Sequence, residues 1–179
     1  MLNLNSEKLA IGNRAVTNKA SSRAKLMKGA RMTEKNRAID EAQIQQLIDG
    51  WAKALRAKDV DGVMSNCAPD ILWFNLAPPL QYLGADVYKK NREEWFATWQ
   101  GSIGYEIRDL CITVGDGVAF GHGLNRIHGT RTNGGHTDVW VRQTLGFRKI
   151  GGKWLITHEH ESVPFYMDGS YKAAVDLKP

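Results

Sequence analysis

From residue 103 onward, apolar and polar residues alternate with a period of two, and this pattern constrains the fold more than any other feature. Glycine-rich turns divide the region into four long extended runs, at 103–114, 117–130, 136–149 and 153–163. Such turns between alternating runs are typical of consecutive antiparallel hairpins. Strands of this length must twist and coil within one sheet, so the sequence predicts a curved sheet with a concave face.

The segment before this sheet carries helical patterns. Apolar residues recur at i, i+3, i+4 and i+7 between Asp40 and Lys58, which predicts one amphipathic helix. Asp59 is a good N-cap for a short second helix, and a third helix fits residues 85–99, after a short strand at 71–75. Three N-terminal helices packed on the concave face of the sheet give an α+β, cone-shaped roll with a hollow at its mouth.

The positive charge of the chain belongs to its N-terminus. Residues 1–31 contain seven Lys or Arg and one acidic residue, whereas the remainder holds 17 basic and 18 acidic residues. We therefore expect a basic, flexible N-terminal arm at 1–31 and one cone domain at 32–179. The arm also resembles an organellar transit peptide, and Met32 is an alternative start; we favour an arm or that start, because composition alone is weak evidence for an address.

The composition excludes several classes of function. A nearly neutral domain argues against a nucleic-acid-binding face. No apolar run approaches the ~18 residues of a membrane span, and two cysteines within apolar patterns fit a reducing cytoplasm better than a disulfide framework. The sequence also has no P-loop, dinucleotide fingerprint, nucleophile elbow or CxxC motif, so we expect no cofactor and no metal.

The last hairpin predicts which side chains face the hollow. If Gly151 and Gly152 form a two-residue loop, the inward pairs are Phe147 with Ile156, Leu145 with His158, and Gln143 with His160. The outer, convex face then carries Arg142 opposite Glu161 and Thr144 opposite Glu159, together with Trp140. We expect this outer face to be a partner surface, because an exposed sheet face with Trp and paired charges is typical of one.

The neighbouring run, 117–130, has a bulkier and a smaller side. The bulkier side contains Phe120, His122, Leu124 and Arg126. We expect this side to point inward, which would place His122 in the interior and Arg126 nearer the mouth.

Several segments together resemble one family. The run from Asp138 to Phe165 is similar to the C-terminal hairpin of SnoaL-like, ketosteroid-isomerase-homologue domains of the nuclear-transport-factor-2-like superfamily. The stretches 57–62 and 77–84 match the same group. Gly152-Lys153-Trp154 followed by His-x-His-x-Ser also resembles the hub domain of calmodulin-dependent kinases. The resemblance spans about residues 37–166 and implies the cone fold, whereas the superfamily's activities range from isomerases and cyclases to scaffolds.

The ketosteroid isomerase catalytic set is not retained. The resemblance places Trp51 at the position of its oxyanion-donating tyrosine, Asn75 at that of its aspartate base, and Thr144 near that of its second aspartate. An asparagine has no useful basicity for removing a proton from carbon. The chemistry of that family is therefore not expected here.

Histidines are the remaining candidates for proton transfer. His158 and His160 share one side of their strand, where they could bind a metal with His122, although we favour core histidines because no carboxylate joins them. Imidazole suits general acid/base work near neutral pH, so we consider His122 and His158 as catalytic residues, with Asn75 binding a carbonyl or hydroxyl. The alternative is that these groups only satisfy each other's hydrogen bonds.

The sequence thus predicts a cytoplasmic protein that binds a small apolar or aromatic molecule, without a membrane or nucleic-acid partner, and the resemblance implies a homodimer through the convex outer face. The predicted ligand-binding residues are Trp51, Trp73, Asn75, Tyr82, Trp95, Arg126, Gln143 and His160. The expected activity is cofactor-free isomerase, cyclase or hydrolase chemistry. The alternative is a non-catalytic binding or oligomerisation module like the kinase hub, which a hollow filled by Trp51 and Trp95 would favour.

Overall fold

The structure is a computed structural model that describes residues 32–179, and Glu34–Pro179 form one compact unit. The expected arm at 1–31 lies outside the described residues. The helices are α2 (Glu34–Ala57), α3 (Val60–Met64) and α4 (Ala85–Ala97). The strands are β1 (Cys67–Phe74), β2 (Tyr82–Leu83), β3 (Trp99–Val114), β4 (Val118–Arg131), β5 (His136–Ile150) and β6 (Lys153–Ser162).

The six strands form one sheet in the order β2-β1-β6-β5-β4-β3. Strands β3 to β6 are joined by three hairpins, which confirms the consecutive antiparallel runs expected from the glycine turns. The sheet is mixed rather than wholly antiparallel, because β1 lies parallel to β6. The chain reaches this geometry by leaving β1 through β2 and α4 and crossing to the far edge at β3 before it returns.

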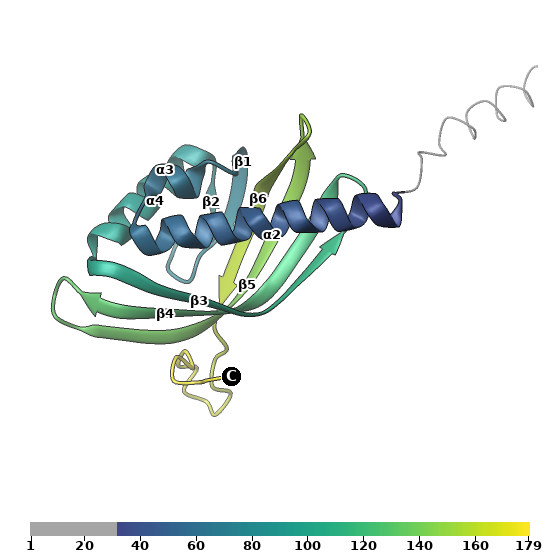
Figure 1. The fold of residues 1–179 in the computed structure, drawn as a ribbon. Coiled ribbons are helices and arrows are strands. Elements are labelled where there is room, and N and C mark those ends of the chain that lie inside the picture. The colour runs from purple at the N-terminus through teal and green to yellow at the C-terminus, as the bar shows by residue number, and fades with distance from the viewer. Residues whose placement is uncertain (1–31) are drawn as a thin grey trace, which may run out of the picture. The chain divides into compact units, whose positions relative to one another are not determined.

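The helices cover one face of the curved sheet, and α2 crosses it along most of its length (Figure 1). Ile48, Trp51 and Leu55 of α2 are buried in one core cluster with Phe147 and Ile156 of the sheet. The α+β cone expected from the sequence is therefore confirmed. Within residues 32–179, no helix combines the length and the apolar character needed to cross a membrane.

Polar anchors fix the helices on the sheet. The Asp59 carboxylate accepts a hydrogen bond from the Gly62 amide at 2.9 Å and caps α3, as its position predicts. At the other end of α2, Asp40 accepts bonds from Lys149 Nζ and from the Trp154 indole at 3.1 Å. These bonds connect the first helix to the β5–β6 hairpin.

An irregularity in β6 decides which side chains enter the hollow. The predicted register holds from the Gly151-Gly152 turn as far as the pair Phe147 and Ile156. The next pair is Gly146 with His158, so Thr157 is an extra residue in β6, a β-bulge. Beyond it, the faces of β6 are exchanged relative to the regular alternation, because the side-chain period of a strand is two.

Deletion of Thr157 tests this role of the bulge. The shortened strand would direct His158 and His160 inward and remove both glutamates from the interior, so we expect a loss of several kcal/mol, as when a buried ion pair loses one partner. Chemical denaturation and near-UV circular dichroism measure the effect. Deletion of Gly134, at the exposed tip of the β4–β5 hairpin, is the control; equal tolerance of both deletions would contradict the role given to the bulge.

Candidate active site in the hollow of the sheet

The face of β4 that was expected to point inward points outward. Ala119 and Ile127 are buried, whereas His122 is exposed and Phe120 is 46% exposed. The prediction followed side-chain bulk and was wrong because Phe147 already occupies the space: Ala119 pairs with Phe147, and a Cβ on Gly121 would touch its ring. Small residues on the inner face of β4 make room for that ring.

The bulge overturns the prediction for the end of β6. His158 and His160 lie on the outer face beside Phe74, and His158 Nδ1 is 2.9 Å from the Leu72 carbonyl oxygen. Glu159 and Glu161, expected outside, are instead buried, at 1% and 6% exposure. Within residues 32–179, no three metal-binding side chains of the His, Cys, Asp and Glu type cluster together.

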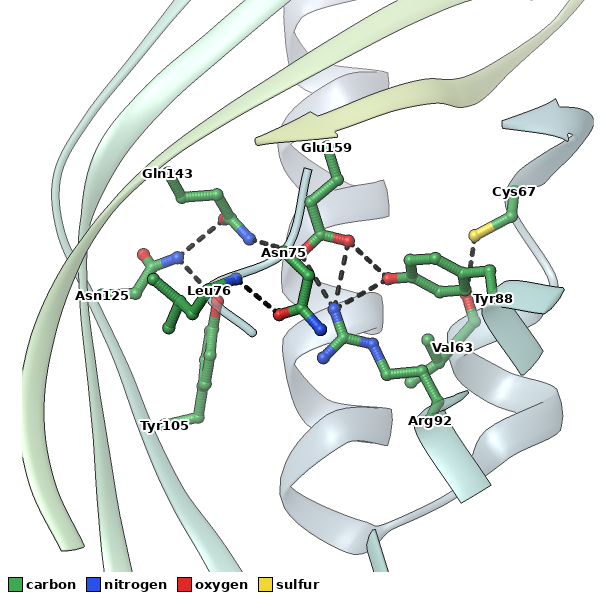
Figure 2. Close-up of polar contacts among 10 residues, drawn as sticks. All are labelled: Val63, Cys67, Asn75, Leu76, Tyr88, Arg92, Tyr105, Asn125, Gln143 and Glu159. Atoms are coloured by element: carbon green, nitrogen blue, oxygen red, sulfur yellow. Dashed lines mark hydrogen bonds and ion pairs between the residues drawn. The ribbon is translucent and has the colours of Figure 1, made fainter. Parts of the chain in front are cut away.

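Glu159 is the centre of a buried polar network (Figure 2). Its carboxylate accepts a hydrogen bond from the Tyr88 hydroxyl at 2.5 Å and two from Arg92 Nη2, at 2.9 and 3.1 Å. Gln143 Nε2 donates a further bond at 3.0 Å and accepts one from Asn125 Nδ2 at 2.7 Å. Both charges are removed from water, and each carboxylate oxygen of Glu159 accepts two hydrogen bonds. A buried ion pair is tolerated under this condition.

Arg92 is held by rings as well as by Glu159. Its guanidinium carbon lies 4.5 Å from the centroid of Trp73, 5.0 Å from Tyr88 and 5.5 Å from Trp95. Aromatic faces attract the delocalised cation and lose little by being desolvated. Its Nε nevertheless has no hydrogen-bond partner among the described residues.

Next to this network lies a cavity of about 280 Å³, close to the lower end of the range for ligand sites. Its apolar wall includes Trp73, Trp95 and Ile127, and its polar wall includes Asn75, Asn91, Tyr105, Arg131 and Glu161. Trp73 and Asn75 share this side, as their spacing on β1 predicts. Trp51 does not fill the hollow, because it is buried in the core against Tyr105.

Glu161 lines this cavity with a carboxyl group whose pKa is shifted towards neutral pH. Burial and, secondly, the neighbouring charge of Glu159 raise its pKa from the ordinary 4.5 to about 7, while Arg92 and the Trp73 side chain oppose the rise. A carboxyl group with this pKa is present in both protonation states at neutral pH. It can therefore accept or donate a proton inside the cavity.

Asn75 supplies an oriented donor on the same wall. Its Oδ1 accepts a hydrogen bond from the Leu76 amide at 2.7 Å. The Nδ2 group of the same side chain makes no hydrogen bond with any other part of residues 32–179, and Asn75 lines the cavity. An amide NH₂ group can donate to a carbonyl or hydroxyl oxygen, and the role expected for Asn75 stays a prediction.

The other predicted ligand-binding residues are divided between several places. Gln143 faces inward as predicted but belongs to the Glu159 network. Tyr82 contacts the ring of Trp73 and donates its hydroxyl to the Pro78 carbonyl, so it supports the cavity wall from behind. Arg126 lies on the outer face, where Asp138 and Glu106 pair with it.

Arg92 is the signal in the sequence that could have revealed the glutamates. It lies one helical turn after Tyr88 on the face of α4 that packs on β1. An arginine on a buried helix face requires a carboxylate opposite it. Glu159 and Glu161 offer two at i, i+2 spacing in the last strand, and only the assumption of an unbroken alternation directed them outward.

The fold and the cavity define an α+β cone domain with a buried, titratable site, and comparisons with known proteins agree with this class. The chain belongs to the SnoaL-like domain family, whose model matches residues 44–166. No curated protein matches the chain. An NTF2-like protein of unknown function from Pseudomonas putida KT2440 is 33% identical in sequence, with a TM-score of 0.73, over 79% of this chain and 98% of that one.

More distant structures share the fold alone. A ketosteroid isomerase-like protein from Erwinia carotovora atroseptica is 20% identical, with a TM-score of 0.59, over 68% of this chain and 93% of that one. The association domain of the Caenorhabditis elegans calcium/calmodulin-dependent kinase II is 14% identical, with a TM-score of 0.57, over 72% and 99%. One fold thus carries proteins of unlike description, so the site must decide the function.

The two glutamates predict opposite effects on stability. Glu159→Gln leaves Arg92 buried without a countercharge, and we expect a loss of about 3–5 kcal/mol in the free energy of unfolding. Glu161 binds its proton more tightly in the folded protein than in the unfolded chain. The free energy of unfolding therefore falls as the pH rises from 4.5 to about 7. Glu161→Gln should therefore stabilise the protein above pH 7, by on the order of 1–3 kcal/mol.

Urea denaturation of both variants and the wild type, repeated at several pH values, measures these effects. The advantage of Glu161→Gln should shrink as the pH falls through about 7 and vanish below 4.5, where wild-type Glu161 is protonated in the folded and the unfolded state. A Glu161→Gln variant that is less stable than the wild type at pH 8 would show that Glu161 is a structural anchor like Glu159.

Proposed function

We propose that this domain binds a small, partly apolar molecule in the cavity and moves a proton on it without a cofactor, with Glu161 as the acid/base group. The observation that carries the proposal is a buried carboxyl group, lining a cavity, whose pKa is about 7. General acid/base groups work best when their pKa lies near the pH of the reaction.

The geometry supports proton abstraction next to a carbonyl group. Asn75 Nδ2 would donate a hydrogen bond to the carbonyl oxygen, and the ionised Glu161 would take a proton from the adjacent carbon. The electron pair of the broken C–H bond then moves towards the oxygen that Asn75 holds. Return of the proton to a different carbon completes an isomerisation and restores the carboxylate; an attack by the same carbanion on a second carbonyl is the first step of a cyclisation.

Glu161 replaces the histidines in this role. The side chains of His122 and His158 lie on the outer face of the sheet, whereas Glu161 lines the cavity with Asn75 and Trp73. The open hollow also favours a binding function over a purely structural module, because Trp51 and Trp95 together leave it unfilled.

Deuterium exchange tests the proton transfer without knowledge of the substrate. Small cyclic and aromatic ketones are incubated with the protein in D₂O, and deuterium incorporation is measured by proton NMR. We expect catalysed exchange for part of the panel, a loss of about 10²–10⁴-fold in Glu161→Gln, and a rate that rises with pH through about 7 as Glu161 ionises.

His122→Gln is the matched control, because it removes a titratable group from the exposed outer face. Exchange that survives Glu161→Gln and disappears in His122→Gln would return the catalytic role to histidine. Exchange by no member of a broad panel, together with binding of none, would contradict the proposal for the cavity as a whole.

We also propose that the outer face of the sheet forms a homodimer. Two large apolar side chains at the start of β4, Val118 and Phe120, are 56% and 46% exposed on or beside this face. Nearby, Phe74 packs edge-on against His158 and His160. A continuous sheet face of this kind matches a second copy of itself across a two-fold axis, which is the commonest arrangement of soluble oligomers.

Thr144→Glu tests the dimer, since Thr144 lies on the outer face between His122 and His160 in the strand register. Two glutamates brought together near a two-fold axis repel each other, so we expect a dimeric wild type and a folded, monomeric variant by light scattering after size exclusion. Thr132→Glu, in the β4–β5 turn, should leave the dimer intact. A monomeric wild type at high micromolar concentration would contradict the proposal.

A further inference from the structure

Arg131, at the end of β4, is a cation fixed in place without an acidic partner among residues 32–179. Its Nε donates to Thr137 Oγ1 at 2.9 Å and its Nη1 to Thr98 Oγ1 at 2.7 Å. Its guanidinium carbon lies 3.6 Å from the centroid of the buried Trp99 ring. Two hydroxyl groups and a ring therefore hold the side chain in one orientation, and it lines the same cavity as Glu161.

This arginine differs from the others that are buried or half-buried. Arg92 pairs with Glu159, and Arg126 pairs with Asp138 and Glu106. Within residues 32–179, no carboxylate lies at ion-pairing distance from Arg131. Its positive charge is partly desolvated and is compensated only by neutral groups, and burial lowers its pKa from the ordinary value.

The donors of Arg131 are only partly used. A guanidinium has five N–H groups in a planar fork, and the two hydroxyl groups take two of them. Nη2 makes no hydrogen bond with any other part of the described chain. A planar fork with free donors, held rigid at the wall of a cavity, matches the two oxygens of a carboxylate.

We propose that Arg131 is the anion-binding end of the cavity and takes the carboxylate of a small organic acid, whose apolar body lies against Trp73, Trp95 and Ile127. This inference rests on the proposed function and gives the chemical class of the ligand at the same site. The single negative charge of the ligand replaces the partner that Arg131 lacks within the chain.

The volume and charge of the cavity restrict the ligand further. At the ~30 Å³ that each molecule occupies in liquid water, 280 Å³ is the volume of roughly nine water molecules, which is room for a compact molecule such as benzoate. A doubly charged phosphate is disfavoured, because one unpaired arginine faces it and the carboxyl group of Glu161 shares the cavity. The site therefore fits an acid with one carboxylate and a compact ring or branched chain.

NMR titration of the full chain with benzoate and with benzamide tests the subsite, because the two molecules share shape and differ in charge. We expect benzoate to bind at least about tenfold more tightly than benzamide, as a charge-assisted pair with arginine predicts. Arg131→Gln should weaken benzoate binding by about ten- to a hundredfold and leave benzamide unchanged. Arg131→Lys should fall between, since it keeps the charge and loses the fork.

Arg148→Gln is the matched control, because it removes the same charge from an exposed ion pair with Asp70 outside the cavity; it should bind benzoate like the wild type. If Arg131→Gln is unstable, the NMR signal of the Arg131 Nε–H group in the wild type supplies the evidence. We expect benzoate to shift this signal and benzamide to leave it in place. Equal binding of both probes overturns the subsite and leaves the cavity as a ligand pocket. A wild type that binds neither probe also overturns it, and the deuterium-exchange assay on the same preparation then shows whether proton transfer at Glu161 stands alone.

Discussion

The guanidinium of Arg92, buried at 4% exposure, sets the requirement that the rest of the site has to meet. A cation in this position is tolerated only with a carboxylate in contact and donors that complete the hydrogen bonding of that carboxylate. Glu159 provides the charge, and Tyr88 and Gln143 complete its bonds. The helix α4, the strand β5 and the strand β6 are thus joined by one buried polar network.

The bulge at Thr157 is what allows this contact and the proposed site together. Without it, β6 would continue the alternation set by Trp154 and Ile156 and present imidazoles to Arg92. With it, two glutamates enter the interior two residues apart, and they differ in their partners. Glu159 uses its oxygens in the network, whereas Glu161 faces the cavity beside a like charge, and this difference in surroundings raises the pKa of one carboxyl group to about 7. One irregular residue therefore produces both a structural and a titratable carboxylate.

The sequence predicted the parts of the fold that depend on local pattern. Glycine turns and period-two runs located β3 to β6, and the Gly151-Gly152 turn gave the correct register as far as Ile156. The bulge that follows depends on how Arg92 and Glu159 meet across the core, and no local pattern encodes a contact between residues 67 positions apart. The prediction of the inner face of β4 was wrong for a similar reason. The ring of Phe147, on a neighbouring strand, leaves room only for small residues such as Ala119 and Gly121. Alternation identifies the two faces of a strand, and long-range packing chooses between them.

Two arginines and two glutamates lie in and around one cavity, and they differ in whether their charges are compensated within the chain. Arg92 and Glu159 neutralise each other within the chain, and removal of either partner alone would leave a buried charge. Glu161 and Arg131 have no such partners among the described residues, and each costs stability because it is desolvated without an opposite charge in contact. An apolar residue of similar volume would serve a purely structural core better than the buried Glu161. The proposed ligand would meet Arg131 with a negative charge and Glu161 with a transferable proton, and so would supply the partner that each group lacks within the described residues.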